Sequence, residues 1–207
     1  MFQVFTKNLL FLTILFISYS LISEEYKAGK HYQILPQTIA TRDAKKIEII
    51  EFFWFGCGHC YSLENQLKSW EEKLPSDIDF WRSPITWNEM AKTHAKLFFA
   101  AEFFEKPEII SNTFVSIHAN RRMLTSDQEL QPFFASFGIT EDQYLSLFNS
   151  FAMQNKIRRA DTFGLKYQIR GVPAFIVNGK YKVSASNDVG TAELLDVVDY
   201  LINLERD

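Results

Sequence analysis

The 207-residue chain contains two cysteines, Cys57 and Cys60, which are separated by two residues. Three kinds of chemistry fit such a pair: a structural disulfide, half of a zinc site, or a reactive dithiol. A disulfide between neighbours this close would close almost no loop, so it would contribute little stability. A structural zinc site needs four ligands, usually from a second close pair. The histidines His31, His94 and His118 are scattered along the sequence and are interpreted as ordinary surface or core residues. We therefore favour a reactive dithiol and expect no metal site.

The residues around the pair predict a strand followed by a helix. Residues 46–55 place β-branched and aromatic side chains on both alternating faces, which is typical of a strand buried on both sides. Residues 60–74 carry Leu63 and Leu67 at helical spacing, and Pro75 ends the pattern. The two cysteines are therefore expected where a strand turns into the first turn of a helix.

A Cys-x-x-Cys pair at a strand-to-helix junction is typical of thioredoxin-like redox proteins. Cys57 would lie at the helix N-terminus, where unpaired N–H groups and the helix dipole favour an anion. His59, between the cysteines, can supply a cation or a hydrogen bond. We expect Cys57 to be the attacking thiolate, and Cys60, which lies deeper in the first turn, to resolve the mixed disulfide.

Glu51 is an acid on a strand face that is otherwise apolar. It shares that face with Ile49 and Phe53, and burying a carboxylate is costly unless it is paired. Arg82, on the next predicted strand, is a candidate partner. The alternative is an acid at the solvated end of a strand.

The remaining elements follow one another as a strand, a helical block, a hairpin and a final helix. The sequence patterns predict them over residues 78–82, 88–167, 174–183 and 191–204. The hairpin is predicted from Asn178-Gly179, because Asn-Gly between two apolar runs is a strong turn signal. This order of elements predicts an α/β sheet with an all-helical insertion.

The first residues have the pattern of a secretory signal peptide. Lys7 precedes an apolar run, and small residues follow before Glu24-Glu25. The apolar run is about 14 residues long, shorter than the roughly 20 that span a bilayer, so an uncleaved membrane anchor is the less favoured alternative. We expect cleavage near Ser20 or Ser23 and export of the mature chain.

Composition excludes some classes of partner. The formal net charge is −3, which is too small to indicate binding to nucleic acid or to an anionic membrane surface. The hydrophobic fraction of 47% and the chain length suit one globular domain that carries an insertion.

The order of these motifs resembles the DsbA family of periplasmic thiol–disulfide oxidoreductases, and the match covers nearly all of the expected mature chain. The matching stretches are residues 29–32, 51–53, 57–61, 171–174 and 177–181. The resemblance implies a thioredoxin-like fold with an inserted all-helical domain. The expected parts are a signal peptide (1–23), a thioredoxin-like domain (24–87 and 168–207) and a helical insertion domain (88–167).

The resemblance also implies roles for single residues. Val172-Pro173 matches the family's cis-proline, which faces the dithiol and offers backbone groups to an extended substrate; the alternative is a proline that simply begins a strand. Glu51 matches a buried acid that relays a proton as the resolving cysteine reacts. Gly58 stands beside the reactive cysteine where many members have proline, so the redox strength of the pair stays open.

In function, the resemblance implies a periplasmic oxidase that donates its Cys57–Cys60 disulfide to newly exported, unfolded proteins with free cysteines. No bound cofactor is expected, since the disulfide itself is the oxidant. A DsbB-type membrane partner linked to quinone would reoxidise the dithiol, and the protein is expected to be a monomer.

Two alternatives are retained. The first is a disulfide isomerase or reductant on the same fold, although the 33 residues 24–56 are too few for the dimerisation domain that precedes the thioredoxin domain of dimeric periplasmic isomerases. The second is a non-catalytic peptide-binding module or holdase, which would have no need of reactive cysteines.

Overall fold

The computed structural model describes residues 26–206, so the expected signal peptide (1–23) lies outside the described residues. The described part contains five strands and seven α-helices. In chain order they are β1 (Gln33–Ile34), β2 (Ile47–Phe53), α1 (Gly58–Glu71), β3 (Ile78–Pro84), α2 (Glu89–Phe103), α3 (Glu108–His118), α4 (Asp127–Ala135), α5 (Glu141–Phe148), α6 (Phe151–Lys166), β4 (Ala174–Val177), β5 (Tyr181–Ser184) and α7 (Leu194–Arg206). A short 3-10 turn, η1 (Thr191–Glu193), leads into α7.

The five strands form one mixed sheet in the order β1-β5-β4-β2-β3. Strand β2 runs parallel to β3 and antiparallel to β4, so it has a partner on each edge. All of its residues from Glu48 to Phe53 are buried. This confirms the sequence prediction of a strand buried on both sides.

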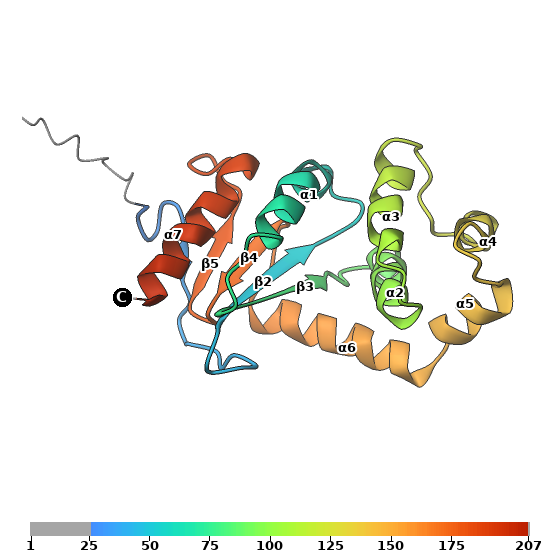
Figure 1. Cartoon of the computed structure of the whole chain (residues 1–207), viewed down its shortest axis with the longest axis horizontal. Coiled ribbons are helices and arrows are strands. Elements are labelled where there is room, and N and C mark those ends of the chain that lie inside the picture. Colours follow the sequence, from blue (N-terminus) through green and yellow to red (C-terminus); the bar gives the residue numbers. More distant parts are fainter. Residues whose placement is uncertain (1–25, 207) are drawn as a thin grey trace, which may run out of the picture.

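Helices cover both faces of the sheet (Figure 1). On one face, Leu63 and Leu67 of α1 and Val198 and Leu201 of α7 pack with Ile49 and its neighbours in one apolar cluster. On the other face, the end of α6 and the following residues pack against the opposite side of β2 and β4 in a second cluster. The sheet is therefore the middle layer, and the cysteine pair lies at the start of α1, shortly after the C-terminal end of β2.

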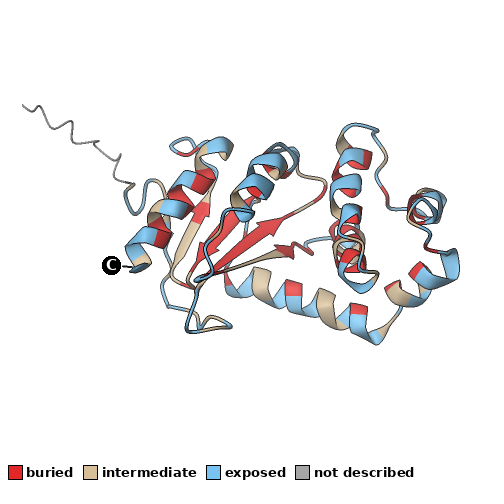
Figure 2. Ribbon diagram, in the orientation of Figure 1, coloured by how far each residue is buried: buried red, intermediate tan, exposed pale blue. Residues whose placement is uncertain are grey.

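The predicted helical insertion is confirmed as helices α2 to α6, which lie between β3 and β4 in the chain. Figure 2 shows buried residues on the facing sides of these helices. They share a core that is rich in phenylalanine and continuous with Phe53 and Phe55 beside the dithiol. We keep residues 88–167 as the proposed extent of this domain.

The predicted Asn-Gly turn joins β4 to β5. Asn178 and Gly179 both have positive φ angles, +48° and +62°, as this kind of hairpin turn requires. A Cβ at position 179 would also lie only 1.9 Å from the carbonyl oxygen of Ile39. The turn thus allows the segment before β2 to pack closely against the hairpin.

The structure differs from the sequence expectations at several element ends. Strand β1 was not predicted, because two residues give no alternating pattern; its pairing with β5 continues in a 2.7 Å hydrogen bond from Leu35 N–H to the Lys180 carbonyl. Helix α1 begins at Gly58 rather than Cys60, and the C-terminal helix is preceded by η1. These are changes of one to three residues in the predicted elements, apart from the added strand.

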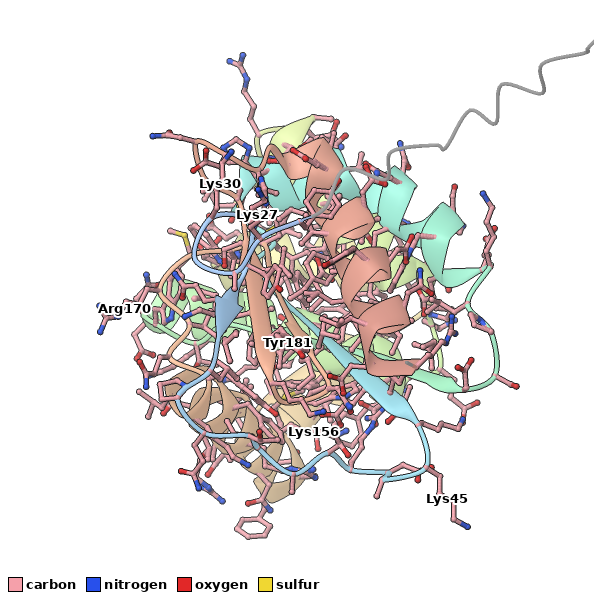
Figure 3. The ribbon with its side chains drawn as sticks, turned by 90° about the vertical axis from the view of Figure 1, so that its left-hand side faces the viewer. Lys27, Lys30, Lys45, Lys156, Arg170 and Tyr181 are labelled. Atoms are coloured by element: carbon pink, nitrogen blue, oxygen red, sulfur yellow. The ribbon has the colours of Figure 1, made fainter. Side chains whose placement is uncertain are left out.

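The end of the molecule that carries α7 and β1 is viewed in Figure 3. Arg170 lies at the left margin of this view and Lys27 and Lys30 lie in its upper left, and all three are exposed, whereas Tyr181 of β5 lies near the centre. The Tyr181 ring meets Tyr32 edge-on, with 5.6 Å between centroids.

Within residues 26–206, no helix has both the length and the apolar character that a membrane crossing requires.

Candidate active site

The two cysteines lie at the start of α1, as the sequence predicts. Cys57 is the N-cap residue, with φ −90° and ψ 118°, and its N–H donates to the Trp54 carbonyl oxygen at 2.9 Å. Its sulfur accepts a hydrogen bond from the backbone N–H of Cys60 at 3.4 Å. Both cysteines are free thiols, so the structure describes the reduced form.

The surroundings of Cys57 favour its thiolate. Its pKa is lowered from 9.0 to about 6, chiefly by a hydrogen bond from the Cys60 thiol. Partial burial opposes this shift, while the backbone N–H groups of Cys60 and His59 and the positive charge of His59 add to it. At neutral pH the Cys57 thiol is therefore mostly ionised. The thiolate is the nucleophilic form of cysteine.

The surroundings of Cys60 have the opposite effect. Its side chain is 1% exposed, and burial raises its pKa. The hydrogen bond that it gives to Cys57 and the negative charge of Glu51 raise it further. Cys60 is therefore a protonated, shielded thiol beside an accessible thiolate. This asymmetry is what an attacking and a resolving cysteine require.

Val172 approaches the pair from a distant part of the chain. The Cys57 thiol donates to the Val172 carbonyl oxygen at 3.3 Å across 115 residues of sequence. The peptide bond between Val172 and Pro173 is cis, as the sequence resemblance implies. Gly58, which follows Cys57 in the chain, is exposed, and a Cβ there would meet no atom within 4 Å.

Glu51 and Arg82 lie opposite each other in the register of β2 and β3. The side chain of Glu51 is fully buried, and its Oε2 accepts a hydrogen bond from Nε of Arg82. The guanidinium group also donates two 2.9 Å hydrogen bonds to the carboxylate of Glu64 on α1. The pairing of Glu51 with Arg82 is therefore confirmed, and a solvated strand end is excluded.

Burial raises the pKa of Glu51 from 4.5 to about 7. Arg82 opposes the shift, but the negative charges of Glu64 and Glu71 support it. The second carboxyl oxygen, Oε1, is buried and has no hydrogen-bond partner in the described part of the chain. An ionised carboxylate is poorly stabilised at that atom, so Glu51 can hold or release a proton near neutral pH.

Glu64 was missed by the sequence interpretation. It lies four residues after Cys60 on α1, on the helix side that also carries the buried Leu63 and Leu67. A charged residue at a buried helical spacing was the available signal, because such a charge needs a partner.

His118, which the sequence interpretation treated as an ordinary surface or core residue, also contacts the residues that flank the cysteine motif. Its Nε2 donates to the carbonyl oxygen of Phe55 at 2.7 Å, and its ring stacks on Tyr61 with centroids 4.7 Å apart and planes 6° apart. Phe55 and Tyr61 flank the cysteine motif, so one ring at the end of α3 contacts both of its sides. No sequence spacing reveals this contact, because 63 residues separate His118 from Phe55.

The other histidines outside the cysteine motif make structural contacts. His94 is buried, with Nε2 2.8 Å from the carbonyl oxygen of Met123, and Nδ1 of His31 accepts from the backbone N–H of Lys27 at 2.8 Å. Within residues 26–206, no three His, Cys, Asp or Glu side chains converge as a metal site would need.

Comparison with known proteins agrees with this geometry. The family described as a DSBA-like thioredoxin domain matches residues 77–196. The thiol:disulfide interchange protein DsbA of Pseudomonas aeruginosa is 35% identical over 185 residues, which cover 89% of this chain and 88% of that protein. The DsbA of Azotobacter vinelandii is 35% identical over 188 residues, which cover 90% of this chain and 88% of that protein.

Solved structures give the same result. The crystal structure of Pseudomonas aeruginosa DsbA superposes with a TM-score of 0.82 at 34% identity, and the match covers 89% of this chain and 96% of that one. The oxidoreductase DsbA from Xylella fastidiosa superposes with a TM-score of 0.79 at 25% identity, over 87% of this chain and 98% of that one.

The exposed glycine beside Cys57 gives a first prediction. Gly58 is the first residue of α1, a position that favours proline, and Cys57 before it already has the extended backbone that a following proline requires. Gly58→Pro should therefore stabilise the protein by about 1 kcal/mol, mainly by restricting the unfolded chain. Urea unfolding measures the change. Gly58→Ala is the control for loss of glycine alone, and a Gly58→Pro variant less stable than Gly58→Ala would contradict the assigned backbone geometry.

Proposed function

Since the chain belongs to the DSBA-like thioredoxin domain family and is a thiol:disulfide oxidoreductase, we propose that Cys57 and Cys60 carry its reaction and that it runs as an oxidase of other proteins. The observation that carries this proposal is the opposite shift of the two thiols. Cys57, partly exposed, has its pKa lowered to about 6, while burial raises that of Cys60. A Cys57 thiolate that is stable in the folded enzyme favours the reduced form of the pair and is a good leaving group from a mixed disulfide, so a substrate readily reduces the Cys57–Cys60 disulfide.

The proposed reaction has two exchanges. In the first, a substrate thiolate attacks the Cys57 sulfur, the Cys57–Cys60 bond breaks, and Cys60 leaves and takes up a proton. In the second, another thiolate of the substrate attacks the substrate sulfur of the mixed disulfide and releases Cys57 as a thiolate. Two substrate thiols become one disulfide, and the enzyme gains two electrons as a dithiol. Of the two protons lost by the substrate, Cys60 keeps one and solvent takes the other.

Glu51 is proposed as the proton carrier for Cys60. Its pKa of about 7 lets it hold a proton in a buried position, and its charge already acts on Cys60. The unpartnered Oε1 is the atom available for that proton. Arg82, held by both Glu51 and Glu64, keeps the carboxyl group in place.

Val172, Pro173 and Gly58 are proposed to contact the substrate. The Val172 carbonyl oxygen lies 3.3 Å from the Cys57 sulfur, so a substrate bonded to that sulfur would pass beside this backbone. Gly58 is exposed next to Cys57 and leaves room for an incoming chain. His59 is proposed to assist through its charge and its backbone N–H, which both lower the pKa of Cys57.

The cellular setting is also proposed. The sequence resemblance supports a periplasmic protein, exported by residues 1–23, whose substrates are newly exported, unfolded proteins with free cysteines. Its redox-active disulfide serves as the oxidant without a further cofactor. We propose reoxidation by a DsbB-type membrane protein linked to quinone, and a monomeric state.

The two alternatives lead to different measurements. An isomerase or reductant on this fold would act on disulfides in preference to free thiols. A holdase would protect unfolded chains from aggregation just as well after both cysteines were replaced by serine. The proposed oxidase instead loses its activity in that double variant.

Single cysteine variants test the assigned roles. Cys57→Ser should abolish oxidation of a reduced, unfolded substrate protein, because the sulfur that is attacked is gone. Cys60→Ser, given a substrate that already contains a disulfide, should accumulate mixed disulfides, because the Cys57 thiolate attacks that disulfide and no Cys60 thiol remains to release the substrate. Non-reducing electrophoresis detects these adducts. Faster alkylation of Cys60 than of Cys57 in the reduced parent protein, at mildly acidic pH, would reverse the assignment.

Glu51→Gln tests the proton carrier. A neutral amide cannot relay a proton, so turnover should fall by about tenfold or more. The parent rate should change near pH 7, where Glu51 titrates, and the variant should lose this inflection. Stopped-flow rates between mildly acidic and mildly basic pH measure both effects. A variant with the parent rate and the parent pH profile would remove Glu51 from the reaction.

The stability of the two redox forms tests the direction of the reaction. A lowered thiol pKa stabilises the reduced folded state above the unfolded pKa of about 9, and this stability is lost as pH falls through about 6. At neutral pH the effect is about 1 kcal/mol, so we expect the reduced form to be the more stable. Between about pH 6 and pH 8, the difference between the reduced and oxidised forms should grow by about 1 to 2 kcal/mol.

Urea unfolding of both forms measures this difference. Burial of Glu51 has the opposite effect to ionisation of Cys57. Because burial raises the pKa of this acid, its contribution to the free energy of unfolding falls as pH rises from 4.5 to about 7. Cys57→Ser, which retains Glu51 but cannot form the disulfide, is the control for the reduced form, and its free energy of unfolding should show no comparable rise with pH. An oxidised form that stays clearly more stable across this range would point to a reductant.

A further inference from the structure

We propose that Thr191, at the start of η1, is a positioning residue for His59 and thereby raises the reduction potential of the dithiol. The two residues are 132 positions apart, and Oγ1 of Thr191 lies 3.2 Å from Nδ1 of His59. The inference deepens the proposed function and rests on it, because it concerns how the same dithiol is tuned.

The segment that carries Thr191 is attached to α1 at two points. The first is the Thr191–His59 contact, and the second is a 2.9 Å hydrogen bond from Nε2 of Gln66 to the carbonyl oxygen of Ala192. His59 and Gln66 are seven residues apart, so they project from the same side of α1. The C-terminal segment therefore lies along the catalytic helix and reaches its first turn.

The Thr191 hydroxyl suits both states of the imidazole. A hydroxyl group has one donor and two acceptor lone pairs, so it can accept from Nδ1–H of the cationic ring or donate to Nδ1 of the neutral ring. Either way Nδ1 is engaged, and the orientation of the ring at the helix N-terminus is restricted.

The oriented ring of His59 acts on Cys57. The positive charge of His59 is one of the groups that lower the pKa of this thiol. The other groups are the Cys60 thiol and the backbone N–H groups of Cys60 and His59, and none of them depends on Thr191. Loss of the hydroxyl should therefore remove part of the thiolate stabilisation and leave most of it in place.

The test compares Thr191→Val with Thr191→Ser. Valine has the shape of threonine without the hydroxyl, so the pKa of Cys57 should rise by about 0.5. The equilibrium constant for oxidation of glutathione by the disulfide should fall about threefold, which corresponds to about 15 mV. Serine retains the hydroxyl and should give the parent values. The ultraviolet absorbance of the thiolate reports the pKa, and glutathione buffers report the potential.

Two further variants separate the hydroxyl from the docking of the segment. Gln66→Ala removes the other contact between α1 and η1 but keeps the hydroxyl, so it should leave the pKa of Cys57 unchanged. In a His59→Ala background, Thr191→Val should have no further effect, because the group on which it acts is gone. Equal shifts in Gln66→Ala and Thr191→Val, or an unchanged shift in the His59→Ala background, would overturn the inference.

The outcome is independent of the proposed oxidase activity. The pKa and the glutathione equilibrium are properties of the dithiol and require no protein substrate. Parent values in Thr191→Val would reject the role of Thr191 while leaving the oxidase proposal intact. A parent enzyme that fails to oxidise proteins would reject the oxidase proposal, and the shift in Thr191→Val would still report on Thr191.

Discussion

The hydrogen bond from the Cys60 backbone N–H to the Cys57 sulfur is the contact on which the site depends. Helix N-termini are usually capped by a side-chain oxygen, because the first N–H groups have no partner within the helix. Here a sulfur is the cap. A thiolate is a better acceptor than a thiol or a disulfide sulfur, so the start of α1 is best satisfied when Cys57 is reduced and ionised. The order of the helix and part of the reactivity of the nucleophile thus share one cause.

The buried charges below the dithiol impose a second constraint. One guanidinium group, that of Arg82, faces the carboxyl groups of Glu51 and Glu64. Buried ions are tolerated only when charges are balanced and their polar atoms are paired. With Glu51 protonated, the three side chains carry no net charge, and with Glu51 ionised they carry one excess negative charge beneath the cysteines. The balance of this small group therefore explains why burial outweighs the Arg82 ion pair in setting the pKa of Glu51.

Features with a local cause were predictable from the sequence. The buried pattern around Glu51, the helix that starts at the cysteine motif and the Asn178-Gly179 turn each follow from neighbouring residues, and the structure contains all three. The family resemblance added the approach of Val172. Glu64, His118 and Thr191 were not predicted. Each meets a residue that lies far away in sequence or on another element, so its role exists only after the sheet and the insertion have assembled. Strand β1 belongs with them, because its two residues are strands only through their pairing with β5.

The place of the helical insertion has a consequence for biosynthesis. Ribosomes deliver the chain from its N-terminus, so Cys57 is made long before Val172, which follows 115 residues later. Until then β2 lacks the neighbour that β4 provides, and the Cys57 sulfur lacks its carbonyl contact. The nascent cysteine pair therefore spends most of translation outside the environment that makes it a selective oxidant. The finished site appears only when residues 172–177 have been made, which ties redox competence to synthesis of the part of the chain that follows the helical insertion.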